Sequence, residues 1–414
     1  MEKNNKTLNV PHLRFPEFSG EWDHISLSDI ADIVGGGTPD TSVVEYWGGN
    51  IQWFTPSEIG KEKYARLSER TITEAGIKNS SAKLLPQGTV LLSSRATIGE
   101  CSIARQECTT NQGFQSLIAE TDKVTSEFLY YLVPTIKKEM LRRSCGSTFL
   151  EISANELRKI YVYRPSLTEQ NKLAEFMSLL DLRIETQKKI IEDLKKLKDA
   201  IAEKLFCSPD DETPELRIAN SSVCWNLYRL KDVCQRISER NSQKSSSLVL
   251  TIAAQYGLVS QTDFFNKSVA SENLSNYYLI QKGDFAYNKS YSGEHPWGAV
   301  KRLELYEKGV LSPLYICFRP NPLIVNSDFL SHYFETHKWH NGIAQIAGEG
   351  ARNHGLLNVS ISDYFATLHR LPGLPEQKKI ASYLNLLSDK ISLANKELKC
   401  YSRQKQYLLA RMFI

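Results

Sequence analysis

The chain repeats its own sequence at offsets of 201 to 207 residues, and this duplication constrains its architecture more than any other feature. The segment Pro11-x-Leu13-Arg14, with Trp22 eleven residues after the proline, recurs as Pro214-x-Leu216-Arg217 with Trp225. Further matches follow in the same order: 27–30 with 230–233, 126–129 with 327–330, and Pro165, Glu169, Gln170, Leu180, Ile184 and Phe206 with Pro372, Glu376, Gln377, Leu387, Ile391 and Phe413. Solenoid repeats span roughly 20–50 residues, so this longer period indicates two homologous halves in tandem.

Each half consists of a variable block followed by a helical segment. The length of 414 residues suits two or three domains. Glycine turns before apolar runs at 88–92 and 283–287 predict strands, and 128–132 and 329–334 predict short amphipathic helices. We therefore expect an α/β fold with these parts: an N-terminal segment 1–20, a mixed α/β block 21–165, a helix 166–208, a linker 209–224, a second mixed α/β block 225–372, and a second helix 373–414.

The helical segments carry a coiled-coil pattern. From Leu173 to Leu205, apolar residues recur at alternating steps of four and three, and Ser166 to Glu169 forms a capping box before them. The second segment repeats the pattern, with a lysine at the same register, Lys198 and Lys405. The two stripes could pack on each other, or each helix could pack only on its own block. We favour mutual packing because no other segment offers a matching stripe.

The linker decides the direction of the helices. A helix of 38 residues is roughly 57 Å long, whereas the eighteen residues from 207 to 224 reach at most about 59 Å when fully extended. Parallel helices would stretch this connection to its limit, while antiparallel helices need only the local turn that Ser208-Pro209-Asp210-Asp211 predicts. We expect an antiparallel pair with a block at each end, approximate twofold symmetry, and Ile414 near the first block.

Composition excludes several classes of protein. An apolar fraction of 41% and a charged fraction of 24% argue against a disordered or fibrous chain. The net charge of +4 gives no global basic field, so any DNA contact must come from local patches. No apolar run approaches the ~18 residues of a membrane span, and residues 1–10 lack the apolar core of a secretory signal. With eight scattered cysteines, we expect a cytoplasmic protein.

The sequence contains no complete catalytic or metal-binding motif. Phosphate-binding loops, GxSxG, HExxH and GxGxxG are absent, and the cysteines and histidines have no zinc spacing. The stretch 321–324 only faintly resembles an amino-methyltransferase loop, and the Glu-x-Lys triplets at 376–378 and 397–399 fall on the predicted helix. We expect no catalytic residue, no metal and no cofactor on this chain.

Basic and polar clusters interleaved with aromatic residues are the remaining candidates for function. Arginine, lysine and asparagine read base edges, while serine, tyrosine and lysine hold phosphates. Two related but diverged blocks also suit a split, asymmetric target. The predicted DNA contacts are Lys61, Lys63, Arg66, Ser94, Arg95, Lys244, Asn288, Lys289, Tyr291, Arg352 and Asn353.

Several motifs resemble the target recognition domains of type I restriction–modification specificity subunits. In the first block these are 35–39 (GGGTP), 46–53 (YWGGNIQW), 95–99 (RATIG) and 111–114 (NQGF). In the second block they are 283–289 (GDFAYNK) and 309–315 (GVLSPLY), and the segments 165–170 and 372–377 resemble the starts of the family's conserved helices. The second block has 240–244 (RNSQK) in place of the glycine-rich opening. This departure suggests two different half-sites.

The resemblance implies a non-catalytic reader of double-stranded DNA. In such families the specificity subunit recruits two methyltransferase subunits through its conserved helices, and restriction subunits join the complex. It also implies that S-adenosylmethionine (AdoMet), ATP and Mg belong to those partners.

Two alternatives from other classes stay open. A tandem scaffold that binds only protein would show no salt-dependent DNA binding, because phosphate neutralisation releases counterions. An enzyme would require a cluster of titratable residues that the sequence does not assemble.

Overall fold

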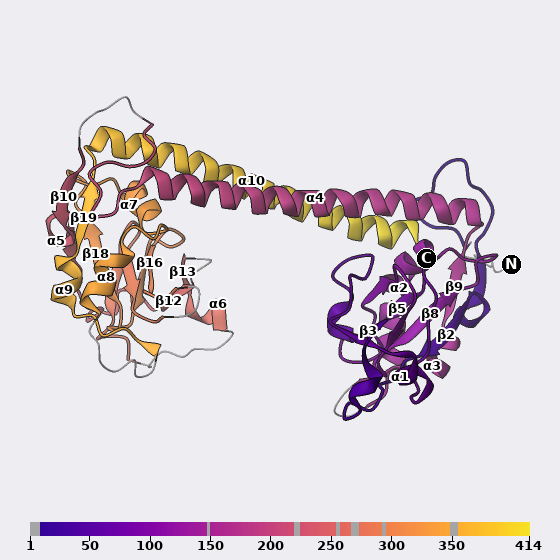
Figure 1. Ribbon diagram of the computed structural model, residues 1–414. Helices are drawn as coiled ribbons and strands as arrows, with labels where there is room; N and C mark the ends of the chain where they lie inside the picture. Colours follow the sequence, from indigo (N-terminus) through magenta and orange to yellow (C-terminus); the bar gives the residue numbers. More distant parts are fainter. Residues whose placement is uncertain are drawn as a thin grey trace. The chain divides into compact units, whose positions relative to one another are not determined.

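The computed structural model describes residues 9–146, 150–218, 224–253, 257–265, 273–291, 295–347 and 355–414. Its contacts divide the chain into two compact units (Figure 1): Met1–Lys188 with Glu397–Ile414, and Lys189–Lys396. In the parts that the structure describes, no helix is long and apolar enough to cross a membrane.

The first unit is built around a four-stranded antiparallel sheet with the order β2-β8-β5-β6. A second sheet, β4-β3-β7, pairs β3 with β7 in parallel, and β1 pairs with β9 as an antiparallel ribbon. The strands are β1 (Asp23–Ser26), β2 (Ala31–Gly35), β3 (Trp47–Phe54), β4 (Arg70–Ile72), β5 (Val90–Leu92), β6 (Cys101–Ile103), β7 (Cys108–Thr110), β8 (Gln115–Ala119) and β9 (Tyr161–Arg164). The helices of the block are η1 (Leu27–Asp29), η2 (Val44–Tyr46), η3 (Pro56–Glu58), α1 (Glu74–Lys78), α2 (Ser126–Arg143) and α3 (Ala154–Arg158).

Helix α2 joins this sheet to the long helices. Thr125 caps it by accepting a hydrogen bond from the amide of Phe128 at 3.2 Å. Phe128 is fully buried and stacks on Phe413, with ring centroids 5.4 Å apart. Ile414 packs against the same core, which confirms that the chain end returns to the first block.

The second unit repeats the strand order of the first. Its four-stranded antiparallel sheet runs β11-β18-β15-β16, and its ribbon pairs β10 with β19. Two separate antiparallel strand pairs, β12-β13 and β14-β17, replace the three-stranded sheet. The strands are β10 (Asn226–Arg229), β11 (Cys234–Arg236), β12 (Leu250–Ala253), β13 (Gly257–Ser260), β14 (Tyr278–Gln281), β15 (Phe285–Asn288), β16 (Ala299–Arg302), β17 (Lys308–Leu311), β18 (Ile316–Pro320) and β19 (Leu368–Leu371); the short helices are α5 (Leu230–Val233), α6 (Gln261–Phe265), α7 (Ser327–Tyr333), α8 (His340–Ile346) and α9 (Ile361–Ala366). The predicted duplication is therefore present in the topology.

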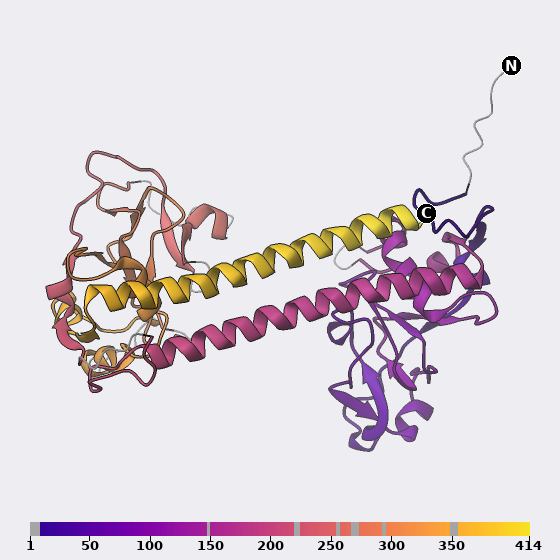
Figure 2. The same cartoon turned by 90° about the horizontal axis from the view of Figure 1, so that it is seen from above.

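The two long helices are α4 (Leu167–Leu205) and α10 (Leu374–Met412), within a few residues of the predicted bounds. In the first unit, contacts pair Asp181 with Lys405, Arg183 with Tyr401 (2.9 Å), and Gln187 with Glu397 (3.0 Å). Residue numbers rise along α4 as they fall along α10, so the helices are antiparallel, as predicted (Figure 2).

The seam positions are buried or half-buried, and the helices also pack on the blocks. Leu173, Met177 and Leu180 belong to the core of the first block, while Ile380 and Leu384 belong to that of the second. Both packing arrangements therefore occur: the long helices pack on each other, and they also pack on the blocks. Hydrophobic burial at both kinds of contact stabilises helices of this length better than helix propensity alone could.

The duplicated Pro-x-Leu-Arg segment acts as a clip between helix ends. Leu13 donates its amide to the carbonyl of Arg411 at 2.9 Å, and the Arg14 guanidinium binds both carboxylate oxygens of Glu169 at 2.7 Å. Trp22 donates its indole N–H to the same carboxylate at 3.3 Å. The first clip, residues 13–14, thus joins the end of α10 to the start of α4.

The second unit has the same clip, residues 216–217. Leu216 donates its amide to the carbonyl of Lys204 at 2.9 Å, and Arg217 binds Glu376 at 3.0 and 3.1 Å. This pairing corrects half of the predicted capping box. The Ser166 hydroxyl does accept from the amide of Glu169 at 3.3 Å, but the Glu169 carboxylate binds the clip instead of the helix start.

The duplicated glutamine after each clip glutamate is buried and fully hydrogen-bonded. Gln170 accepts from the amide of Thr125 at 3.0 Å and donates to the carbonyls of Lys123 and Pro165. Gln377 accepts from the amide of Asn326 at 2.7 Å and donates to the carbonyls of Ile324 and Pro372. Each glutamine thus fixes its long helix to the segment before the block's own helix, which explains why these residues recur.

Candidate nucleic-acid interface

The first predicted cluster, at residues 61–66, is split by the fold. Lys61 is exposed and makes no hydrogen bond or ion pair with any described residue. Arg66 is also exposed, and it forms an ion pair with Glu62, four residues earlier. Both side chains can reach a ligand at the surface, although Arg66 would have to leave a carboxylate to do so.

Lys63 points the other way, towards the helices. Its ammonium group donates to the hydroxyl of Ser178 on α4 at 2.6 Å, pairs with Glu127 on α2, and lies 5.1 Å from the ring centroid of Tyr131. Burial and a hydrogen bond to Glu127 raise the pKa of nearby Tyr64 to about 12, so the phenol stays protonated. The polar group around Lys63 joins the block to α4, and its charge is engaged within the unit.

The second predicted cluster lies at the end of β5. Ser94 is fully buried; its amide donates to the carbonyl of Gly113 at 2.8 Å, and its hydroxyl has no partner among the described residues. The Arg95 Nε lies 2.9 Å from Glu151, in an ion pair without the alignment of a hydrogen bond. Ser94 is therefore part of the frame, whereas Arg95 is half-exposed beside a carboxylate.

In the second block, three predicted residues gather where β15 ends. The side-chain oxygen of Asn288 accepts a hydrogen bond from the amide of Ser290 at 3.0 Å. The carbonyl of Lys289 accepts one from the amide of Leu357 at 2.9 Å, and the amide of Tyr291 donates one to the carbonyl of Gly355 at 3.1 Å. Their backbones are thus fixed, and all three are partly exposed. Lys244 lies apart from them in an exposed turn with φ of 52°. Arg352 and Asn353 lie outside the described residues.

A stacked pair that we did not predict from the sequence lies on the three-stranded sheet of the first block. The Arg70 guanidinium lies over the Trp47 ring, 3.5 Å from its centroid, and 5.3 Å from that of Trp53. Arg70 is the cross-strand neighbour of Trp53 in the β3–β4 pair. Both tryptophans belong to the motif at 46–53, but the sequence does not show which strand pairs with it.

The glycine-rich opening of the first block is tightly packed beside this sheet. A Cβ on Gly36 would lie 2.1 Å from the carbonyl oxygen of Asn111, and one on Gly37 would lie 2.3 Å from the backbone of Ser81. Thr38 donates from its hydroxyl to Gln112 at 2.5 Å. Only glycine allows this approach, so the two resemblance motifs at 35–39 and 111–114 meet in space.

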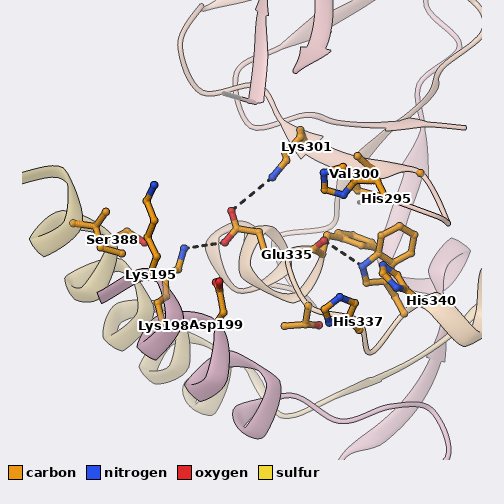
Figure 3. A pocket seen from close by; sticks show the side chains of 16 residues that line it. Lys195, Lys198, Asp199, His295, Val300, Lys301, Glu335, His337, His340 and Ser388 are labelled. Carbon is orange, nitrogen blue, oxygen red and sulfur yellow. Dashed lines mark hydrogen bonds and ion pairs between the residues drawn. The ribbon is translucent and has the colours of Figure 1, made fainter. Parts of the chain in front are cut away.

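The second unit contains a charged pocket between α4, β16 and the segment after α7 (Figure 3). Glu335 lies 2.9 Å from Lys198 and 3.9 Å from Lys301. Burial pushes the pKa of Glu335 up, but His332 and the two lysines outweigh it and lower the pKa to about 2. The carboxylate is therefore charged at neutral pH.

One histidine of this pocket has a strongly shifted pKa. Burial and the neighbouring His337 lower the pKa of His340 to about 4, so it is neutral. His337 lies 2.7 Å from Glu203 on α4. No group of three or more histidine, cysteine or acidic side chains within the described ranges could hold a metal ion. The pocket is best explained as an ionic contact that fixes α4 to the block. Lys405 pairs with Asp181 in the first unit, so both seam lysines serve such contacts.

Comparisons with known proteins identify the domain. Residues 19–196 match the family described as "Type I restriction modification DNA specificity domain". The specificity subunit of the type I restriction enzyme MjaIX of Methanocaldococcus jannaschii is 37% identical over 232 residues, which cover 54% of each chain. The EcoR124I/EcoR124II specificity subunit of Escherichia coli is 26% identical over 176 residues, which cover 41% of this chain and 43% of the relative. The chain thus spans about half the length of the curated relatives it matches.

Solved structures agree over nearly the whole chain. The specificity subunit of a type I restriction–modification system from M. genitalium superposes with a TM-score of 0.54 at 16% identity, covering 98% of this chain and 99% of that one. A chain from a study of complex assembly and conformational transition in the type I system gives 0.60 at 15% identity, covering 97% and 99%. These likenesses show a shared fold. Together with the domain match, they show that residues 19–196 carry a type I restriction modification DNA specificity domain and that the chain is similar to specificity subunits of type I restriction enzymes.

Proposed function

We propose that this chain is the non-catalytic, DNA-reading specificity subunit of a type I restriction–modification complex, and that it reads an asymmetric, bipartite target in double-stranded DNA. One observation carries the proposal: both units have the same clip, ribbon and four-stranded sheet but different outer strands. A constant frame with a variable periphery suits two readers with different sequence preferences. The specificity-domain match at 19–196 supports DNA recognition by the first block.

We further propose that the target recognition domains are residues 21–165 and 225–372. The exposed or partly exposed candidates, Lys61, Arg66 and Arg95 in the first domain and Lys244, Asn288, Lys289 and Tyr291 in the second, are the ones able to reach DNA. Lys63 and Ser94 support the frame through the contacts described above. Within each domain, contacts to phosphates would position the protein on the duplex, and contacts to base edges would determine the sequence that it recognises.

The proposed partners are two methyltransferase subunits and the restriction subunits, and they supply S-adenosylmethionine, ATP and Mg in the cytoplasm. A repeated surface supports a partner that binds twice. Leu179 on α4 and Leu386 on α10 occupy equivalent places in the duplicated helices, and they are 59% and 65% exposed. We propose that these two matched side chains belong to the surfaces that the two methyltransferase subunits contact.

The direct test is DNA binding by the chain together with its methyltransferase subunit. We expect a specific duplex to bind with an affinity that falls steeply with salt, because cationic side chains displace counterions from phosphates. Binding that is absent or insensitive to salt would favour a scaffold that binds only protein. A methyltransferase complex assembled without this chain is the control.

A further inference from the structure

We propose that Arg70 is a base-reading residue of the first block and that it recognises a guanine through the major groove. The inference rests on the proposed function and names one specificity-determining side chain within it. It starts from the stacked pair on the β3–β4 strands, which the sequence did not reveal.

The guanidinium of Arg70 lies over an aromatic ring. It lies 3.5 Å from the ring centroid of Trp47, while the Trp53 centroid is 5.3 Å away. Arginine stacks on an aromatic face through its planar, delocalised cation, and a stacked guanidinium keeps its N–H edge free for other partners. The long side chain therefore loses much of its freedom before any ligand arrives.

The platform beneath Arg70 is itself fixed. Trp47 donates its indole N–H to the carbonyl of Asp40 at 3.1 Å and meets Trp53 edge to face, with centroids 5.0 Å apart at 88°. Trp53 is buried and donates to the carbonyl of Gly37 at 2.9 Å. Because Gly37 lies in the tightly packed glycine-rich opening, the platform is rigid down to the core. Rigidity of this kind lowers the entropic cost of a specific contact.

Arg70 also differs from the two described arginines that were predicted to bind DNA, Arg66 and Arg95. Arg66 is paired with Glu62, and Arg95 lies beside Glu151. Arg70 is exposed, and no described residue offers it a carboxylate. An unpaired, planar fork of N–H donors matches the O6 and N7 acceptors of guanine, which is the commonest specific arginine contact in the major groove.

The two arginine roles make different demands on the side chain. A phosphate contact needs only a positive charge, so lysine would serve, and the contact would carry no sequence information. A bidentate contact to guanine through two coplanar N–H groups uses the planar fork of arginine, so lysine does not replace arginine there without loss. The variants Arg70→Lys and Arg70→Met separate these roles, because methionine keeps an apolar chain over Trp47 while removing the donors.

The experiment uses the full chain with its methyltransferase subunit. Binding to the cognate duplex and to duplexes changed at each half-site base pair is measured for wild type, both variants, and Lys78→Ala, a matched exposed cation on α1. We expect both Arg70 variants to lose about 5- to 150-fold in cognate affinity. The loss should disappear when one G·C pair of a single half-site is replaced, and Lys78→Ala should behave as wild type.

Three outcomes would overturn the inference. If Arg70→Lys kept the wild-type difference in affinity between the cognate and the changed duplexes, Arg70 would be assigned to a phosphate. An equal loss of affinity on all duplexes in both variants would lead to the same assignment. Wild-type behaviour of Arg70→Met would remove Arg70 from the interface. Failure of the proposed function looks different, because the wild-type complex itself would then show no sequence-specific binding. Thermal denaturation of each variant confirms that the chain is folded.

Discussion

The first clip offers the sharpest test of how the fold is held together. Arg14 and Glu169 are 13% and 2% exposed, so the substitution Arg14→Met would leave a carboxylate buried with only the indole N–H of Trp22 as a side-chain partner. Removing one partner of a buried ion pair typically costs about 3–5 kcal/mol. We expect a loss of this size in the stability of the first unit.

Hydrogen exchange measured by mass spectrometry can follow this loss in the helices that the clip joins. Peptides from residues 167–188 and 397–412 should exchange at least about a hundredfold faster in Arg14→Met, since each 1.4 kcal/mol is a factor of ten. The double variant Arg14→Met/Glu169→Gln should recover part of the protection, because no charge then remains buried. A coupling free energy of about 2 kcal/mol between the two positions is expected.

An exposed ion pair in the same unit provides the control. Arg164 and Asp23 form an ion pair at 2.6 Å, and their side chains are 24% and 59% exposed. Arg164→Met should therefore lower the free energy of unfolding by less than about 1 kcal/mol. Equal effects of Arg14→Met and Arg164→Met would refute the reasoning, because the clip would then contribute no more than a surface contact. Arg217→Met should destabilise the second unit in the same way as Arg14→Met destabilises the first.

Three further predictions follow from the described contacts. The pKa of Glu335 is lowered from 4.5 to about 2 in the folded chain; its contribution to stability is therefore present above pH 4.5 and lost as the pH falls towards 2, and acid denaturation of Glu335→Gln should lack this component. Gly36→Ala should lower the melting temperature of the first unit, because its Cβ would lie 2.1 Å from the Asn111 carbonyl oxygen; an unchanged melting temperature would contradict the close approach. Lys61→Ala should reduce the slope of the logarithm of the DNA-binding constant against the logarithm of salt concentration by about one. Lys63→Met should instead lower the stability of the first unit with little change in that slope. The reverse pattern would mean that the inward contacts of Lys63 do not persist on DNA.

The duplication and the helices could be predicted from the sequence because both signals are local or periodic. The apolar steps of four and three located α4 and α10 within a few residues. The Pro-x-Leu-Arg segment was recognised as part of the duplication, but its contacts with the helix ends were not predicted. The length of the linker favoured the antiparallel direction. Each of these inferences needed only spacing along the chain.

Sheet order and side-chain direction could not be predicted, because they depend on distant partners. The parallel pairing of β3 with β7 joins strands more than fifty residues apart, and no pattern within either strand specifies the other. Lys63 and Arg66 lie three residues apart in one basic run, yet the fold turns one towards α4 and leaves the other at the surface. Arg70 was missed for the same reason, since Trp47 becomes its neighbour only through the β3–β4 pair.

The central claim is that two separate blocks each read one half of a bipartite target. The most direct measurement is a map of methylated sites after residues 21–165 are replaced by the corresponding block of a related specificity subunit, with the methyltransferase subunit unchanged. The account predicts that one half-site of the methylated motif changes and the other keeps its sequence. A change in both half-sites, or in neither, with the complex folded and active, would contradict it.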